Sequence, residues 1–143
     1  MALLNYTTTI DAHKSIMEIQ SLLAKAGASA IMSEYDDTGN IVALSFRLKL
    51  NDQFISFTLP TDWRPVQAVL IEQRRRNSRI KTDENQARRV AWRITKDWVE
   101  AQLAIIETRM VTTAQVFLPY AVTSNGETMY QYVANNQQLL LDA

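Results

Sequence analysis

Residues 29–59 read SAIMSEYDDTGNIVALSFRLKLNDQFISFTL, and this stretch decides the fold. Apolar and polar residues alternate through two of its segments, as in strands with one buried face. The residues between the segments, D-D-T-G-N and N-D, are typical of tight turns. We therefore expect three antiparallel strands joined by hairpins, at Ser29–Tyr35, Ile41–Leu50 and Gln53–Leu59.

The alternation also predicts which side chains leave the core. If helices cover Leu44, Phe46 and Leu48, the opposite face carries Arg47 and Lys49. Phe54, Ser45 and Ser56 would lie on the same outer face. An exposed aromatic ring among cations is how many proteins stack bases and hold the phosphates of single strands. Contact between two subunits, or simple exposure to solvent, is the alternative role of this face.

The flanking sequence predicts one more strand and several helices. Tyr6–Ile10 is rich in β-branched residues and suits a strand. Asp11, Asp62 and Thr82 or Asp83 can each cap a helix; the first helix would bury Ile16, Ile19, Leu23 and Ala26 and stop at Gly27. The third would run to about Met110, followed by a helical turn at Thr112–Phe117 stopped by Pro119 and a last helix at Met129–Leu141. The expected fold is α+β, in the order β-α-β-β-β-α-α-α. It has an antiparallel four-stranded sheet with helices packed on one face, in a single domain over residues 1–143.

The third predicted helix is apolar along two lines about 120° apart. Ala87, Ala91, Ile94 and Trp98 belong to one line, and Trp92, Val99 and Leu103 to the other. Such a helix needs partners on two sides. One partner would be the sheet, and the other would be a second helix or a second subunit.

The composition excludes most catalytic and metal sites. The 143 residues contain no Cys and a single His, His13, so we expect no metal, no cofactor and no enzyme activity. Asp37-Thr38-Gly39 matches the aspartic-protease signature, but a hairpin turn explains it fully. The acidic residues Asp36, Asp37 and Asp52 could bind a cation only if the fold brought them together. No apolar run is long enough to span a membrane, and the first residues do not resemble a signal peptide.

Positive charge is concentrated in one part of a neutral chain. Residues 74–96 carry nine basic and two acidic side chains, a net charge of +7, and the rest of the chain carries −7. Arginine suits phosphate, because its planar group offers several donors and a permanent charge. Candidate phosphate contacts are Arg74, Arg75, Arg76, Arg79 and Lys81, extended by Arg89 and Arg93. Alternatively, Arg93–Asp97 and Lys96–Glu100 pairs would make the helical part an ordinary salt-bridged face.

Several segments resemble a family of small uncharacterised proteins found in phages and prophages. They include Tyr6–Ile10, Glu34–Asp36, Gln86–Arg93, Lys96–Gln102 and Phe117–Tyr120. The resemblance implies a mobile genetic element as the setting. It implies no catalytic residues.

These features lead to two hypotheses. The first is a non-enzymatic single-stranded DNA-binding protein of phage type, a homodimer or higher homo-oligomer that acts in the cytoplasm of a host cell. The second is a counter-defence protein that binds a host protein or sequesters a signalling nucleotide. It predicts an arginine-lined pocket in place of an open groove.

Overall fold

Three antiparallel strands in the order β1-β2-β3 form the sheet in the computed structural model, which describes residues 2–140. The strands are β1 (Ala30–Tyr35), β2 (Ile41–Leu50) and β3 (Gln53–Thr58). The helices are α1 (Ala12–Lys25), α2 (Trp63–Arg74), α3 (Glu84–Glu107), α4 (Thr113–Phe117) and α5 (Met129–Asn135), with short 3₁₀ turns at Leu118–Tyr120 (η1) and Gln137–Leu140 (η2). The α+β class is confirmed.

The prediction of a fourth strand at Tyr6–Ile10 is wrong. The amides of Tyr6 and Thr8 donate to the carbonyls of Leu3 and Asn5, which makes turns. The carbonyls of Tyr6 and Thr8 accept hydrogen bonds from the Gln86 side chain on α3, each at 3.0 Å. The backbone groups that a strand would pair are therefore already used, and local β-propensity is overridden by tertiary context.

The predicted element order is also wrong, because it includes this absent strand and has three helices after the sheet where residues 2–140 form four. The observed order is α1-β1-β2-β3-α2-α3-α4-α5. The strand boundaries shift by one residue at Ser29 and Leu59, and α3 ends at Glu107, three residues before Met110. Gly27 ends the first helix with φ of 102°, as expected, but Ala26 is exposed and outside the buried stripe.

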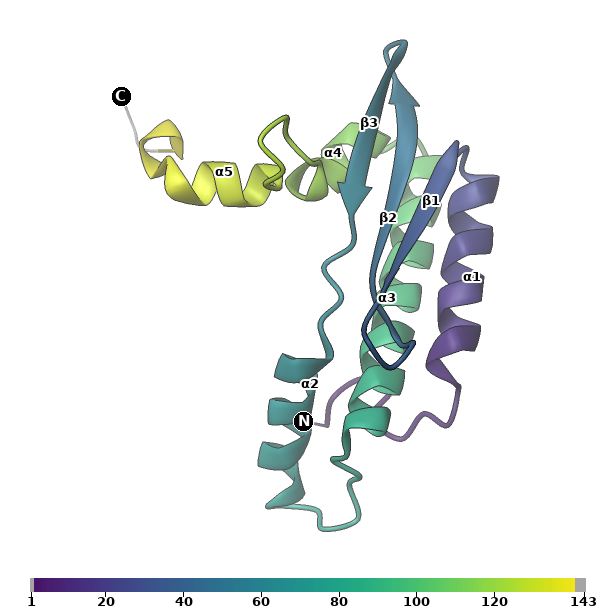
Figure 1. Cartoon of the computed structure of the whole chain (residues 1–143), viewed down its shortest axis with the longest axis vertical. Helices are drawn as coiled ribbons and strands as arrows, with labels where there is room; N and C mark the ends of the chain where they lie inside the picture. The colour runs from purple at the N-terminus through teal and green to yellow at the C-terminus, as the bar shows by residue number, and fades with distance from the viewer. Residues whose placement is uncertain (1, 141–143) are drawn as a thin grey trace.

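Helices α1 and α3 cover one face of the sheet (Figure 1). The outward alternation of β2 holds, because Leu44, Phe46 and Leu48 are buried beneath these helices. Phe46 stacks on Phe57 of β3 with ring centroids 5.3 Å apart, and Phe117 of α4 meets both rings edge-on. This aromatic group, with Ile16, Ile19, Leu23, Trp92 and Val99, forms the main core.

The second partner of α3 is helix α2. Figure 1 shows α2 beside the lower half of α3, beyond the end of the sheet. Leu70 of α2 is fully buried in a second core with Ile80, Ala87 and Val90. Within residues 2–140, α3 thus finds both partners in its own chain, and its two apolar lines do not require a second subunit.

The C-terminal part extends sideways from this body (Figure 1). The predicted helical turn at Thr112–Phe117 is confirmed, because Thr112 caps α4 and α4 ends at Phe117. Pro119 lies in the short 3₁₀ turn η1 that follows. The last helix ends at Asn135, short of the predicted Leu141, which lies outside the described residues. Tyr130 on α5 is 66% exposed, so this arm leaves apolar surface uncovered.

No helix within residues 2–140 has both the length and the apolar character needed to cross a membrane.

Candidate nucleic-acid interface

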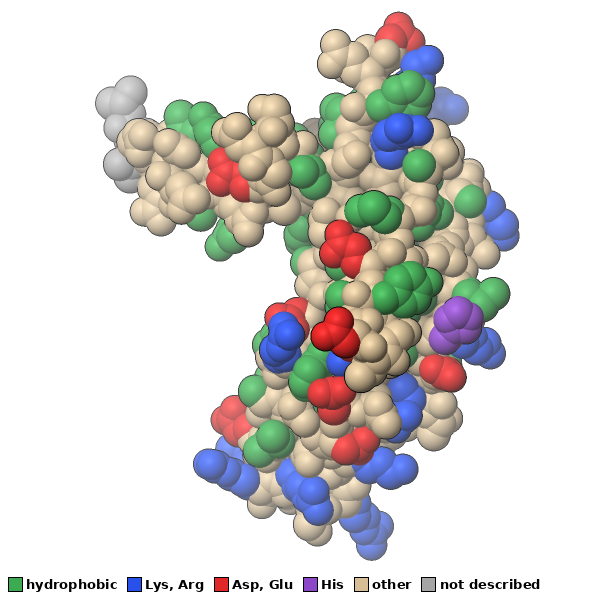
Figure 2. Space-filling view, viewed as in Figure 1, with side chains coloured by type: hydrophobic (Ala, Val, Ile, Leu, Met, Phe, Trp, Pro, Cys, Tyr) green, Lys and Arg blue, Asp and Glu red, His purple; other side chains and the backbone are tan. Residues whose placement is uncertain are grey.

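The basic residues predicted as phosphate contacts gather at one end of the molecule. α2 runs down to the loop 75–83, and α3 starts there and runs back up (Figure 1). Figure 2 shows Lys and Arg side chains crowded along this lower end. We call this surface the basic end; it comprises Arg74, Arg75, Arg76, Arg79, Lys81 and Arg89.

The loop that carries these cations is held by one buried side chain. Ile80 is 5% exposed and packs into the second core. Its neighbours Arg79 and Lys81 are both exposed, because side chains on either side of an inward residue point away from it. The Asn77 side chain accepts from the Arg79 amide at 3.2 Å, and its carbonyl accepts from Ile80. The cations therefore stand on an anchored loop.

The cations of the basic end have no carboxylate partners. Across residues 2–140, no ion pair joins any of them to an Asp or Glu. Arg74 donates to the Thr82 hydroxyl at 3.4 Å, and Arg89 donates to the Gln86 side chain at 2.9 Å. Both partners are neutral, so within residues 2–140 no direct ion pair ties these cations to the acids nearby, among them Glu72, Asp83 and Glu84.

The other cations of residues 74–96 are paired. Arg88 binds Asp36 at 3.4 Å and Glu84 at 3.2 Å, and its guanidinium lies over the Trp63 ring. Lys96 binds Glu100 at 2.9 Å, which confirms that predicted pair.

Arg93 is also paired, but with a different acid from the one predicted. It binds Glu18 of α1 at 2.6 Å, so the predicted Arg93–Asp97 pair is wrong. Asp97 accepts instead from Asn5 at 2.8 Å. Arg93 faces α1 because α1 packs along α3, which spacing within α3 alone does not reveal.

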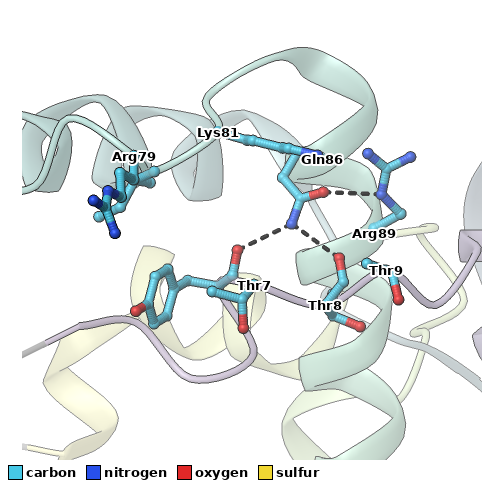
Figure 3. Close-up of a pocket in the computed structure, with 9 residues that line it drawn as sticks. Thr7, Thr8, Thr9, Arg79, Lys81, Gln86 and Arg89 are labelled. Atoms are coloured by element: carbon cyan, nitrogen blue, oxygen red, sulfur yellow. Dashed lines mark hydrogen bonds between the residues drawn. The ribbon is translucent and has the colours of Figure 1, made fainter.

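A small pocket of about 230 Å³ opens at the basic end, between the N-terminal segment and the start of α3. Figure 3 shows Lys81 and Arg89 near the Gln86 amide, Arg79 at the far side of the pocket, and Thr7 and Thr8 across from them. Sequence reasoning missed Gln86 and the threonines as parts of a site. No spacing rule links them to the cations, because Gln86 and Tyr6 are 80 positions apart.

The outer face of the sheet carries a second group of predicted contacts. Phe54 is 57% exposed, and the Arg47 guanidinium carbon lies 4.7 Å from the centre of its ring. Lys49, the cross-strand partner of Phe54, places its ammonium 5.8 Å from the same ring. The Arg47 Nε also donates to the Ser29 hydroxyl at 3.1 Å. We call Arg47, Lys49 and Phe54 the sheet-face cluster.

The two groups of contacts lie at opposite ends of the long axis. The sheet-face cluster is next to the turn Asn51-Asp52 at the upper end, and the basic end is at the bottom (Figure 1). A short segment of nucleic acid cannot contact both the sheet-face cluster and the basic end of one protomer unless it runs the length of the molecule.

The acidic turn residues are not brought together into a metal site within residues 2–140. Asp36 and Asp52 lie in the turns at opposite ends of β2, and within residues 2–140 no group of acids and His could hold a metal ion. The Asn40 amide and then the Thr38 hydroxyl hold the pKa of Asp36 below its ordinary value. Asp36 thus organises the hairpin turn, as D-D-T-G-N predicts. His13 is exposed, on the first turn of α1.

Comparisons with protein-family models, with curated proteins and with solved structures gave no match to this chain.

Proposed function

We propose that this protein binds single-stranded nucleic acid, with DNA as the first candidate, and catalyses no reaction on it. The observation that carries the proposal is the basic end, where Arg74, Arg75, Arg76, Arg79, Lys81 and Arg89 lie together and form no ion pair with any carboxylate of residues 2–140. Phosphate contacts dominate the affinity of proteins for nucleic acids. Arg93 is left out of the proposed interface, because Glu18 already occupies it.

A single strand is favoured over a duplex by the sheet-face cluster. Bases of a single strand stack on aromatic rings and on guanidinium planes, and duplex bases do not reach such a surface. Arg47 already stacks on Phe54, so together they offer a flat cationic platform. Since this platform lies far from the basic end, we propose that it makes a second, weaker contact farther along the strand or from a second protomer.

The proposal extends to a homodimer, or a higher homo-oligomer, in the cytoplasm of a phage-infected cell. The exposed apolar side chains of the C-terminal arm, Tyr130, Tyr132, Leu139 and Leu140, support self-association. Light scattering after size-exclusion chromatography tests it, and a monomer at every concentration contradicts this part. The phage setting depends only on the sequence resemblance.

A titration of a fluorescent oligothymidine of roughly 16 nucleotides tests the proposal by anisotropy. Neutralising about five phosphates should make the affinity fall about 100-fold between about 50 and 200 mM salt. The triple variant Arg75→Ala, Arg76→Ala, Arg79→Ala should lose most of this affinity and reduce the salt slope. No binding at micromolar protein, or an affinity independent of salt, contradicts the proposal.

The matched control removes three cations elsewhere on the surface. Lys14→Ala, Lys25→Ala and Arg64→Ala change the net charge by the same amount, and all three side chains are exposed. We expect this variant to bind within a few-fold of the wild type. An equal loss in both triple variants would mean that net charge, and not the basic end, drives binding.

The second candidate function, a protein that sequesters a signalling nucleotide, is favoured by the pocket that Arg79, Lys81 and Arg89 line. At about 230 Å³ it is smaller than the usual range for pockets that enclose drug-sized ligands, which weighs against a whole cyclic dinucleotide in one chain. Thermal-shift measurements with cyclic dinucleotides and with oligonucleotides separate the two functions. Stabilisation by the cyclic compounds alone favours this second candidate.

A further inference from the structure

The pocket at the basic end differs from the exposed surface around it because its floor is made of buried side chains. Its floor is formed by Gln86, which is 3% exposed, and by Ile80 at 5%. One side is the segment Tyr6–Thr9, and the other is the loop residue pair Arg79 and Lys81 (Figure 3). It is therefore a recess with a buried floor and one hydrogen-bonded side, and the exposed side chains of Arg79 and Lys81 form its other side.

Gln86 fixes the Tyr6–Thr9 side of the pocket and the guanidinium of Arg89. Its amide nitrogen donates to the carbonyls of Tyr6 and Thr8, both at 3.0 Å. Its amide oxygen accepts from the Arg89 Nε at 2.9 Å, which fixes the guanidinium at the pocket edge. The two terminal nitrogens of Arg89 have no hydrogen-bond partner within residues 2–140. They are the donors that a bound anion would use.

Three of the nine residues that line the pocket are cations. Arg79, Lys81 and Arg89 line it, and none of its lining residues is an Asp or Glu. Thr7 and Thr9 are exposed at its rim and add hydroxyl donors. Charge-assisted hydrogen bonds to a phosphate are about twice as strong as those between neutral groups. Three cations without an acid favour a ligand of more than one negative charge.

The charge and the size of the pocket together select one kind of phosphate. A phosphate inside a strand is a diester with a single charge and a chain leaving on both sides. A phosphate monoester carries about −1.5 to −2 charges at neutral pH and three acceptor oxygens. It has one substituent only, which suits a recess of about 230 Å³.

We propose that this pocket binds the terminal phosphate monoester of a nucleic-acid strand. The inference rests on the proposed function. In it, the phosphate at the end of the nucleic-acid strand binds in the pocket, and the internal phosphodiesters that follow contact Arg74, Arg75 and Arg76. The protein then binds phosphorylated strand ends in preference to internal positions.

Three versions of one short oligothymidine test the inference by anisotropy, with a 5′-phosphate, with a 3′-phosphate, or with both ends as hydroxyls. One phosphorylated version should bind roughly tenfold more tightly than the hydroxyl version, which corresponds to one added charge-assisted contact set. The version that gains affinity identifies the end. Excess inorganic phosphate should reduce this gain in affinity, and sodium chloride at the same ionic strength should not.

Two variants locate the gain in the pocket. Arg89→Gln should bring the phosphorylated oligonucleotide down to the affinity of the hydroxyl version. Lys81→Ala should act in the same direction and avoids the partly buried Arg89, should that variant fold poorly. The matched control is Arg75→Ala, outside the pocket, which should weaken both versions by the same factor.

The outcomes separate this inference from the proposed function. Equal affinity for all three versions, with binding retained, overturns the terminal-phosphate site and leaves single-strand binding intact. A gain that survives both pocket variants places the site elsewhere and also overturns the inference. Absence of binding to every version overturns the proposed function and the inference with it.

Discussion

The positively charged residues between Arg74 and Lys96 form two regions that differ in whether the cations are paired with carboxylates. In the α3 region, Arg88, Arg93 and Lys96 each bind at least one carboxylate, and their side chains are between 10% and 15% exposed. At the basic end, Arg75, Arg76 and Arg79 are exposed and have no ion pair within residues 2–140. The same residue type stabilises the fold in one region and remains available to a ligand in the other.

The largest expected effect is the removal of Arg88. It joins the β1–β2 turn at Asp36 to Glu84 on α3 and lies over Trp63. Arg88 is 10% exposed, but Asp36 and Glu84 are 28% and 49% exposed, so water screens part of the loss. Arg88→Ala should lower the free energy of unfolding by about 2 kcal/mol. Urea denaturation measures the change. A variant as stable as the wild type would show that this region is not built on its ion pairs.

A smaller loss of stability is expected for Arg93. Its bond to Glu18 connects α3 to α1, and Glu18 is partly exposed, so water screens the pair. Arg93→Ala should cost about 1.5 kcal/mol. A double-mutant cycle with Glu18→Ala isolates the pair itself, with a coupling of about 1 kcal/mol expected. Additive losses in the cycle would contradict a direct interaction between the two side chains.

Asp36, one of the two acid partners of Arg88, should make the stability of the protein depend on pH. The Asn40 amide and the Thr38 hydroxyl lower the pKa of Asp36 in the folded state below its value in the unfolded chain. Its contribution to stability is therefore complete above the unfolded-state pKa and is lost as the pH falls through the lowered, folded-state pKa.

Asp36→Asn should accordingly weaken the acid dependence of the urea midpoint, measured from neutral to acidic pH. Asp37→Asn is the matched control, because it removes one carboxylate from the same turn but not the one that accepts these hydrogen bonds. If Asp36→Asn leaves the acid dependence of the wild type unchanged, the hydrogen bonds of Asp36 do not contribute to stability.

The smallest effect on stability is expected at the basic end. Arg75→Ala and Arg79→Ala, made singly, should change the free energy of unfolding by less than about 0.5 kcal/mol, since neither side chain forms an ion pair with any residue that the structure describes. The same urea titrations measure this. A loss above about 1 kcal/mol would mean that these cations support the fold after all, and the contrast between the two regions would disappear.

Local features of the fold could be predicted from the sequence because they depend on near neighbours in the chain. Asp11, Asp62 and Asp83 cap their helices as expected, each accepting a hydrogen bond from an amide two or three residues further on. The three strands of residues 29–59 follow from alternation and turn chemistry. The aromatic–cation cluster on the outer sheet face follows from the same alternation.

Contacts between distant residues could not be predicted in this way. The sequence of Tyr6–Ile10 predicts a strand, but the side chain of Gln86 on α3 donates hydrogen bonds to two carbonyls of this segment. Arg93 pairs with Glu18, which is 75 positions away, instead of a neighbour on its own helix. Both outcomes depend on which element packs beside α3, and no spacing within α3 encodes that.

The sequence by itself determined the three strands of residues 29–59, the helix caps and the concentration of positive charge, because each depends on neighbouring residues and on composition. The tertiary structure alone decided which cations remain unpaired, since that depends on where α1 and the β1–β2 turn bring Glu18 and Asp36. It also formed the pocket, by folding the N-terminal threonines against residues 79–89. The sequence sets how many positive charges the chain carries, but the residues that lie beside each cation in the folded structure decide whether it can bind a ligand.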